Sequence, residues 1–239
     1  LTMGAMMMRY LSIKSLVSVG ALVALAACKT VGPDPKRAIA PTVDKPAAGA
    51  TVAELNPPPV GASWVRQQGN ETYTVERLPN GMHDGKEVMV FKGREGRLGY
   101  WDIDSGNWMV GAEPDGKLIS GASPHSGRYN FPLFVGKEWR AESDWTNHRE
   151  GRTWHGRITD WKVEAEEEIT VPAGTFKTLR LQSTPGRYDG WLRTIWYSPE
   201  LGIYIKRHSQ RTADHSSGPS GVFERVLVSY SFPKAPATN

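Results

Sequence analysis

Residues 153–183 read TWHGRITDWKVEAEEEITVPAGTFKTLRLQS, and they predict two long β-strands joined by a tight turn. β-Branched and aromatic residues recur on both sides of Pro172-Ala173-Gly174, and such residues favour strands. Proline ends the first strand because it lacks the N–H that a neighbouring strand needs, and Gly174 supplies the positive φ of a turn. The stretch therefore indicates antiparallel β-structure.

Short aromatic and β-branched runs separated by turn residues continue on both sides of this hairpin. The other predicted strands are 71–78, 86–92, 97–103, 108–112, 117–122, 139–148, 191–197, 203–209 and 222–232. About eleven strands with no long segment of helical period predict an all-β fold: an antiparallel curved sheet or open barrel, or a sandwich. On the last strand, one parity predicts an inward face made of Val222, Val226, Val228, Tyr230 and Phe232.

Composition excludes several classes of protein. The chain has 239 residues, of which 39% are hydrophobic and 23% charged, so it is neither disordered throughout nor a multi-span membrane protein. Its one cysteine, Cys28, excludes an intramolecular disulfide and a cysteine-rich zinc site. Without residues 1–27 the net charge falls from +4 to +2, because Arg9 and Lys14 lie there and no acid does. We expect no nucleic-acid partner, since such a partner needs a concentrated basic surface.

Residues 1–27 are predicted to be a signal peptide. Ser15–Ala27 (SLVSVGALVALAA) follows two basic residues and is too short to span a bilayer, which needs about 20 residues. Leu25-Ala26-Ala27-Cys28 resembles a bacterial lipobox. The resemblance implies that Cys28 carries acyl chains such as palmitate, which anchor the protein to a membrane. The alternative is an ordinary secretory signal followed by a chance cysteine.

The residue after Cys28 indicates whether the lipid anchor lies in the inner or the outer membrane. In enteric-type sorting an aspartate there retains a lipoprotein in the inner membrane, so Lys29 indicates an outer-membrane lipoprotein that faces the periplasm.

Domain organisation follows from composition. Residues 28–60 are predicted to be a lipidated cysteine and a disordered tether, because they lack aromatic residues and are rich in proline: Pro33, Pro35, Pro41, Pro46, Pro57, Pro58 and Pro59. Residues 61–233 are predicted to form a single all-β domain, and 234–239 a disordered tail.

Three segments resemble a known group of proteins. Phe131–Trp139 (FPLFVGKEW), Thr170–Thr178 (TVPAGTFKT) and Thr194–Gly202 (TIWYSPELG) are similar to motifs of exported bacterial all-β proteins of unknown function. The resemblance covers about residues 128–210. It implies a fold like the curved half-barrel of lipoprotein-localisation factors. The motifs are structural, so the resemblance implies no catalytic residue.

A candidate metal site lies on the predicted 139–148 and 153–171 hairpin. A turn at Glu150-Gly151 would bring His148, His155 and Asp144 to one face, and imidazole with carboxylate suits a metal. The alternative to a metal site is a solvent-exposed face with a cross-strand ion pair between Asp144 and Arg157. That face is either buried or flipped by a bulge near Ile158, because the residues that share the parity of His155 farther along the strand are mostly apolar: Trp161, Val163, Ala165, Ile169 and Val171.

Tryptophan and arginine alternate in several places, and this pattern favours a binding surface. Flat rings beside guanidinium groups suit lipid head groups, glycans or peptides. The candidate ligand-binding residues are Trp154, Trp191, Arg193 and Trp196. The alternative is that most of these tryptophans are core.

No Walker loop, nucleophile elbow or HExxH pattern occurs in the sequence. We therefore expect a non-enzymatic, lipid-anchored binding module of the envelope, without a cofactor. The alternatives are an assembly accessory of an envelope complex, with a protein partner, or a hydrolase with an unrecognised site.

Overall fold

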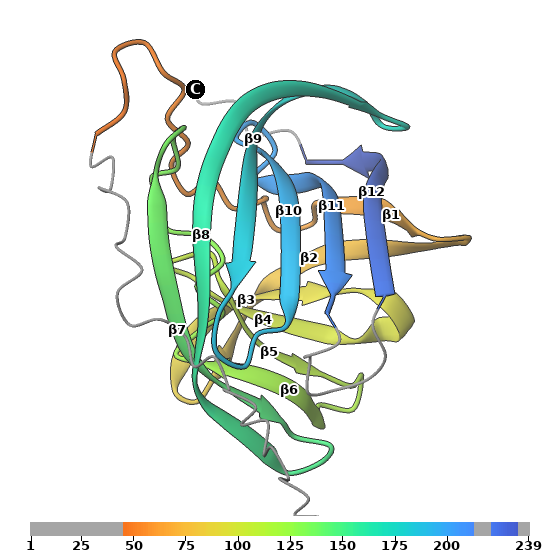
Figure 1. The fold of residues 1–239 in the computed structure, drawn as a ribbon. Helices are drawn as coiled ribbons and strands as arrows, with labels where there is room; N and C mark the ends of the chain where they lie inside the picture. Colours follow the sequence, from red (N-terminus) through yellow and green to blue (C-terminus); the bar gives the residue numbers. More distant parts are fainter. Residues whose placement is uncertain (1–44, 213–220, 234–239) are drawn as a thin grey trace, which may run out of the picture. The chain divides into compact units, whose positions relative to one another are not determined.

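In the computed structural model, each strand pairs antiparallel with the next strand in the chain, and the last strand pairs with the first. The sheet therefore closes into a barrel (Figure 1). The structure describes residues 45–212 and 221–233. The strands are β1 (Ser63–Gln68), β2 (Glu71–His83), β3 (Lys86–Lys92), β4 (Leu98–Asp102), β5 (Trp108–Ala112), β6 (Leu118–Ser123), β7 (Glu138–Asn147), β8 (Arg152–Val171), β9 (Gly174–Pro185), β10 (Trp191–Ser198), β11 (Ile203–Arg211) and β12 (Gly221–Ser231). A 3-10 turn, η1, covers Arg94–Gly96. The prediction of an antiparallel all-β fold is confirmed, and the sheet is a closed barrel.

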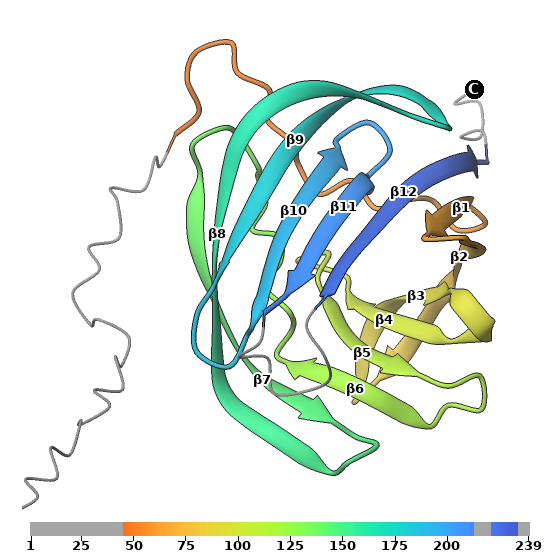
Figure 2. The ribbon, with the colours of Figure 1, turned by 45° about the vertical axis from the view of Figure 1, so that its right-hand side comes forward.

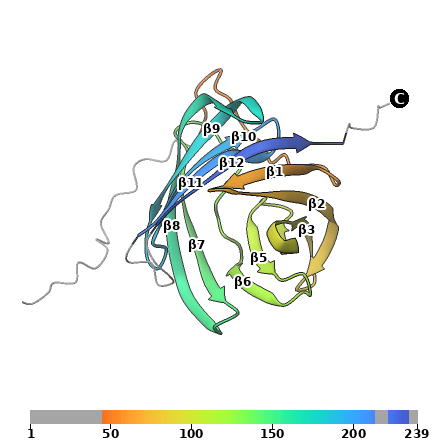
Figure 3. The same ribbon diagram turned by 90° about the vertical axis from the view of Figure 1, so that its right-hand side faces the viewer.

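Strand lengths differ strongly around the ring. β8 has 20 residues and β9 has 12, and they arch beside β10, whereas β4 and β5 have 5 residues each (Figure 2). Figure 3 shows the ring of strands from the side, with β1 beside both β12 and β2. Closure leaves no strand of the ring without a neighbour on either side, which removes the exposed edges of an open sheet.

The hairpin predicted from residues 153–183 is present. Val171 pairs with Gly174, whose φ is +130°, and the register runs from there along β8 and β9. A bulge between Val163 and Ala165 shifts this register by one residue.

Two turns differ from the prediction at the N-terminal end. Pro79-Asn80-Gly81, predicted as a turn, lies inside β2, where a register shift between Leu78 and Gly81 accommodates it. The chain turns instead at Asp84-Gly85, with φ of 48° and 75°, the conformation of a two-residue hairpin loop. β1 was not predicted, although it completes the ring.

The inward face of β12 also differs from the prediction. Val222 is 61% exposed and Tyr230 is 43% exposed, whereas Leu227 is fully buried. The register with β1 shifts between Val65 and Arg66, and such a shift moves the following residues to the other face. The predicted inward set of β12 was therefore wrong at Val222 and Tyr230.

Two apolar clusters support the barrel wall. The first contains Ala53, Tyr129, Leu133, Ala141, Trp161, Val163, Leu179, Leu181, Ile195 and Tyr197. The second contains Ala62, Trp64, Phe176, Leu201, Ile203, Ile205 and Leu227. Both hold residues from strands far apart in sequence, so the core forms only when the ring closes.

Residues 51–58 lie against the barrel, which differs from the tether predicted over 28–60. Ala53 is 1% exposed and pairs with Leu133 through two backbone hydrogen bonds of 2.8 Å. The Asn56 side chain donates to the carbonyl oxygens of Pro199 and Glu200 at 3.0 and 3.1 Å. These hydrogen bonds hold the segment against the barrel, although it lacks aromatic residues and is rich in proline, the two features on which the prediction rested. Cys28 and residues 28–44 lie outside the described residues, as do 234–239.

Candidate functional site

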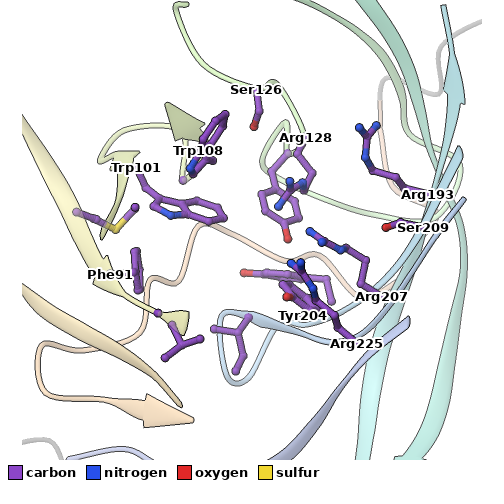
Figure 4. Close-up of a pocket in the computed structure, with 18 of the residues that line it drawn as sticks. Phe91, Trp101, Trp108, Ser126, Arg128, Arg193, Tyr204, Arg207, Ser209 and Arg225 are labelled. Carbon is purple, nitrogen blue, oxygen red and sulfur yellow. The ribbon is translucent and has the colours of Figure 1, made fainter. Parts of the chain in front are cut away.

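The barrel encloses a cavity of about 720 Å³, which we call the barrel cavity (Figure 4). Residues from every strand except β9 line it, together with Leu55, Pro57 and Pro58 of the N-terminal segment. Pockets that hold one drug-sized molecule measure about 300–1,000 Å³. The barrel cavity is therefore large enough for a single small ligand.

Aromatic rings form much of the wall. The tryptophans and the phenylalanines of the lining are Trp64, Phe91, Trp101, Trp108, Phe131, Trp145, Trp154, Trp161 and Trp191. Several pack on one another: the ring centroids of Trp108 and Trp145 are 5.2 Å apart, and those of Phe91 and Trp101 are 5.7 Å apart. Contacts of this kind hold the rings in place and leave an apolar surface facing the cavity.

Three of the four predicted ligand-binding residues line this cavity. Trp154 is only 8% exposed, Trp191 packs against Phe223 at 5.7 Å, and Arg193 extends from β10. Trp196 is not among the lining residues, and its indole donates to a Glu167 carboxylate oxygen at 2.5 Å. Trp154 and Trp191, which the sequence pattern predicted on a binding surface, thus line the inside of a closed barrel.

The three candidate metal ligands do not form a site. His155 Nδ1 lies 2.8 Å from an Asp144 carboxylate oxygen, but the side chains are 78% and 44% exposed. No group of three or more histidine, cysteine, aspartate or glutamate residues that could hold a metal ion occurs within 45–212 and 221–233, His148 included. The alternative Asp144–Arg157 ion pair is absent too, because Arg157 pairs with Asp189.

A bulge explains this arrangement. The β7–β8 register shifts between Ser143 and Trp145, and Gly156 has a φ of +62°. Asp144 accepts a 2.8 Å hydrogen bond from the Gly156 N–H. His155 consequently lies exposed, while Trp154 on one side and Arg157 on the other face the cavity.

A buried carboxylate neutralises part of the cavity wall. Asp189 has no exposed surface, and it accepts hydrogen bonds from Arg157 (2.5 Å), from Arg193 (2.9 and 3.1 Å) and from Thr159 (2.6 Å). Burial alone would raise the pKa of Asp189, but the two guanidinium groups and the Thr159 hydroxyl lower it to about 2. Asp189 is therefore charged at every physiological pH.

Four further arginines of the wall have no such carboxylate. We call Arg66, Arg128, Arg207 and Arg225 the arginine cluster. They come from β1, the β6–β7 loop, β11 and β12, and none of them forms an ion pair with a described acid. Figure 4 shows Arg128, Arg207 and Arg225 directed toward one another around Tyr204.

Tyr204 lies at the centre of the arginine cluster. The Arg66 guanidinium is 3.5 Å from the centre of its ring, and that of Arg207 is 5.5 Å away. Arg66 Nη2 also donates to the Tyr204 carbonyl oxygen at 2.9 Å. Arg66 and Arg207 thus pack on an aromatic face, an arrangement that suits guanidinium groups.

The electrostatics of the cluster follow from burial and crowding. Burial would raise the pKa of Tyr204, but the arginine cluster lowers it to about 7. Burial, with further repulsion from Arg225, Arg128 and Arg193, lowers the pKa of Arg207 to about 9. Both shifts have the sign expected where positive charge exceeds negative charge.

The loop that carries Arg128 is fixed by a fully buried amide. Asn107 donates to the Tyr129 carbonyl at 2.8 Å and accepts from the Tyr129 N–H at 2.9 Å. The Trp139 indole donates to the Gly127 carbonyl at 2.9 Å. These contacts on both sides hold Arg128 over the cavity, 5.9 Å from the Trp101 ring.

Several buried donors of the lining have no hydrogen-bond partner among the described residues. These atoms are Trp64 Nε1, Arg66 Nη1, Ser126 Oγ, Trp161 Nε1, Ser209 Oγ and Arg211 Nε. More than 90% of buried polar groups in folded proteins are paired. The wall thus presents hydrogen-bonding groups that no described residue satisfies.

The sequence did not single out the arginine cluster. Its members lie at 66, 128, 207 and 225, so no local spacing connects them. The one local signal, Arg66 two residues after Trp64, falls on the strand that was not predicted. The aromatic–arginine pattern located the neighbouring wall only.

No helix among the described residues is long and apolar enough to cross a membrane.

Comparisons with known proteins give only distant similarities. No protein-family model matches the chain, and no curated protein matches it. The predicted resemblance to exported all-β proteins and to the localisation-factor half-barrel therefore stays a prediction.

Three solved structures are similar to this chain. One is a protein described as a lipoprotein candidate from Parabacteroides distasonis, with 12% identity and a TM-score of 0.35 over 76% of this chain and 100% of that one. The hypothetical lipoprotein YmcC from Escherichia coli has 12% identity and a TM-score of 0.42 over 74% and 90%. An exported protein with a YmcC-like fold from Bacteroides fragilis has 9% identity and a TM-score of 0.32 over 75% and 99%.

Proposed function

We propose that this chain is a non-enzymatic binding protein whose barrel cavity takes up one small molecule with an apolar chain or ring. The observation that carries the proposal is the cavity of about 720 Å³, walled by aromatic rings and by buried donors that have no partner within 45–212 and 221–233. An apolar ligand part gains by leaving water for the ring surface, and a polar part gains by pairing with the donors.

The proposal includes a lipid anchor at Cys28 in the outer membrane, with the barrel facing the periplasm. Its support is the sequence Leu25-Ala26-Ala27-Cys28 behind a short apolar run, with Lys29 next. Replacing Cys28 by serine should move the protein from the membrane fraction to the soluble periplasm. A Cys28→Ser protein that still sediments with membranes would contradict the anchor.

The neutral dye N-phenyl-1-naphthylamine tests uptake by the cavity. Because tryptophans line the cavity, bound dye should accept their excitation energy. We expect saturable transfer with one dye per chain. Transfer that never saturates, or none at all, would overturn the proposal.

A pair of serine variants locates the bound dye. Ser209 is 3% exposed and lines the cavity, so Ser209→Phe should occupy space that the dye needs and weaken its binding. Ser229 is an exposed residue of β12 outside the lining, and Ser229→Phe serves as the matched control. Thermal melts show whether both variants are folded. Equal dye binding by two folded variants would place the dye elsewhere.

A further inference from the structure

We propose that the arginine cluster is a binding site for an oxyanion, a carboxylate or phosphate-type group, carried by the molecule that occupies the barrel cavity. This inference rests on the proposed function, because it specifies the chemistry of the same ligand. In this proposal the apolar part of the ligand contacts the aromatic wall, and its polar end binds the arginine cluster: Arg66, Arg128, Arg207 and Arg225.

The first argument is the balance of charge around the cavity. No aspartate or glutamate is among the described residues that line it, although several arginines are. Arg94 and Arg97 pair with exposed glutamates, and Arg157 and Arg193 share Asp189. The arginine cluster, like Arg211 beside the Trp191 ring, keeps its charge unbalanced by any described carboxylate.

The second argument is the cost of such an arrangement. A buried charge without a partner is strongly unfavourable, and proteins as a rule pair it. Among the described phenols beside the cluster, only Tyr204 has a lowered pKa, so it can supply at most one charge against four guanidinium groups. A protein whose role was only to fold would gain by replacing one of these arginines. Their presence together fits a site that is completed by an anion.

The third argument is hydrogen-bonding capacity. Guanidinium groups bind carboxylate and phosphate through two parallel N–H donors. Arg66 Nη1 is buried and has no partner, and Ser209 Oγ, which follows Arg207 on β11 by two residues, has none either. Trp101 lies within 5.9 Å of Arg128, so the apolar wall begins where the charged groups end.

A matched pair of dyes separates this inference from the proposed function. N-Phenyl-1-naphthylamine is neutral, and 8-anilinonaphthalene-1-sulfonate has the same rings with one added oxyanion. We expect the sulfonate to bind the folded protein at least about tenfold more tightly, since charge-assisted hydrogen bonds are the strong ones. If neither dye binds, the proposed function fails. If both dyes bind with equal affinity, the proposed uptake by the cavity is supported and the anion site is refuted.

Variants identify the arginines responsible. Arg207→Gln should weaken sulfonate binding by about fivefold or more and leave binding of the neutral dye unchanged. Arg149→Gln is the control: it also removes one arginine charge, but from an exposed turn residue that pairs with Glu113. Thermal melts should place Arg207→Gln at or above the wild type, because it relieves repulsion. An equal loss for both dyes in Arg207→Gln would overturn the inference.

Competition reveals the form in which the oxyanion arrives. Inorganic phosphate that displaces the sulfonate dye but not the neutral dye would mean that the site binds a free oxyanion. Displacement by dodecyl phosphate alone, with inorganic phosphate inactive, would mean that the group is attached to an apolar body. Dodecanol that displaces the sulfonate dye as well as dodecyl phosphate does would refute recognition of the charge.

Discussion

Replacing Asp189 by asparagine should destabilise the barrel by about 3–5 kcal/mol, because it leaves Arg157 and Arg193 buried without their shared counter-charge. Asparagine has nearly the same shape, so packing is preserved and the charge is the main change. It also turns one acceptor oxygen into an N–H₂ donor that faces guanidinium donors.

The lowered pKa of Asp189 expresses part of the same effect. A carboxyl group whose pKa falls from 3.8 to about 2 on folding contributes about 2–3 kcal/mol to stability. Because the folded pKa is the lower one, this contribution is complete above pH 3.8 and is lost as the pH falls through 2. At pH 7 the full contribution is present, so the asparagine variant should show the full loss there.

Urea unfolding at pH 7 measures the free-energy difference, and a thermal melt should show a midpoint lower by roughly 10 °C for a domain of this size. The control is Asp160→Asn, since Asp160 is 39% exposed and pairs with Arg140 on the surface. Exposed pairs contribute about 0–1 kcal/mol. If Asp189→Asn unfolds within about 1 kcal/mol of wild type, the reasoning about charge balance in the cavity is refuted.

Three shorter predictions follow. Tyr204 has a folded pKa of about 7, below its ordinary 10, so the free energy of unfolding should rise with pH from 7 to 9, below the range in which Arg207 titrates; Tyr204→Phe should abolish that rise in urea titrations. Trp154→Ala should cost about 3–5 kcal/mol through the space it leaves, whereas the partly exposed Trp196→Ala should cost clearly less; similar losses would contradict the placement of these rings. Gly202→Ala would put a Cβ 1.6 Å from the Asn56 carbonyl oxygen, so limited proteolysis should cut residues 51–58 faster than in wild type, and unchanged cleavage would count against that contact.

Local features of this protein could be predicted from the sequence. The hairpin at Pro172-Ala173-Gly174 is present, and Asp144 and His155 do lie together, because a tight turn brings its own flanks into register. Parity arguments failed over longer distances. Bulges at Gly156 and between Val65 and Arg66 each shift one register by a residue, which exchanges the inner and outer faces beyond them.

Residue types and local spacing determined the antiparallel strands, most of their turns, and the tryptophans and arginines that face a shared surface. Only the tertiary structure decided that β1 and β12 close the ring, that residues 51–58 dock on it, and that the four members of the arginine cluster meet. The physical reason is that a strand pattern specifies which residues share a face, but not which distant strand lies beside it. That choice depends on the summed burial and backbone pairing of the whole barrel, and this sum also brings four unbalanced guanidinium groups into one cavity.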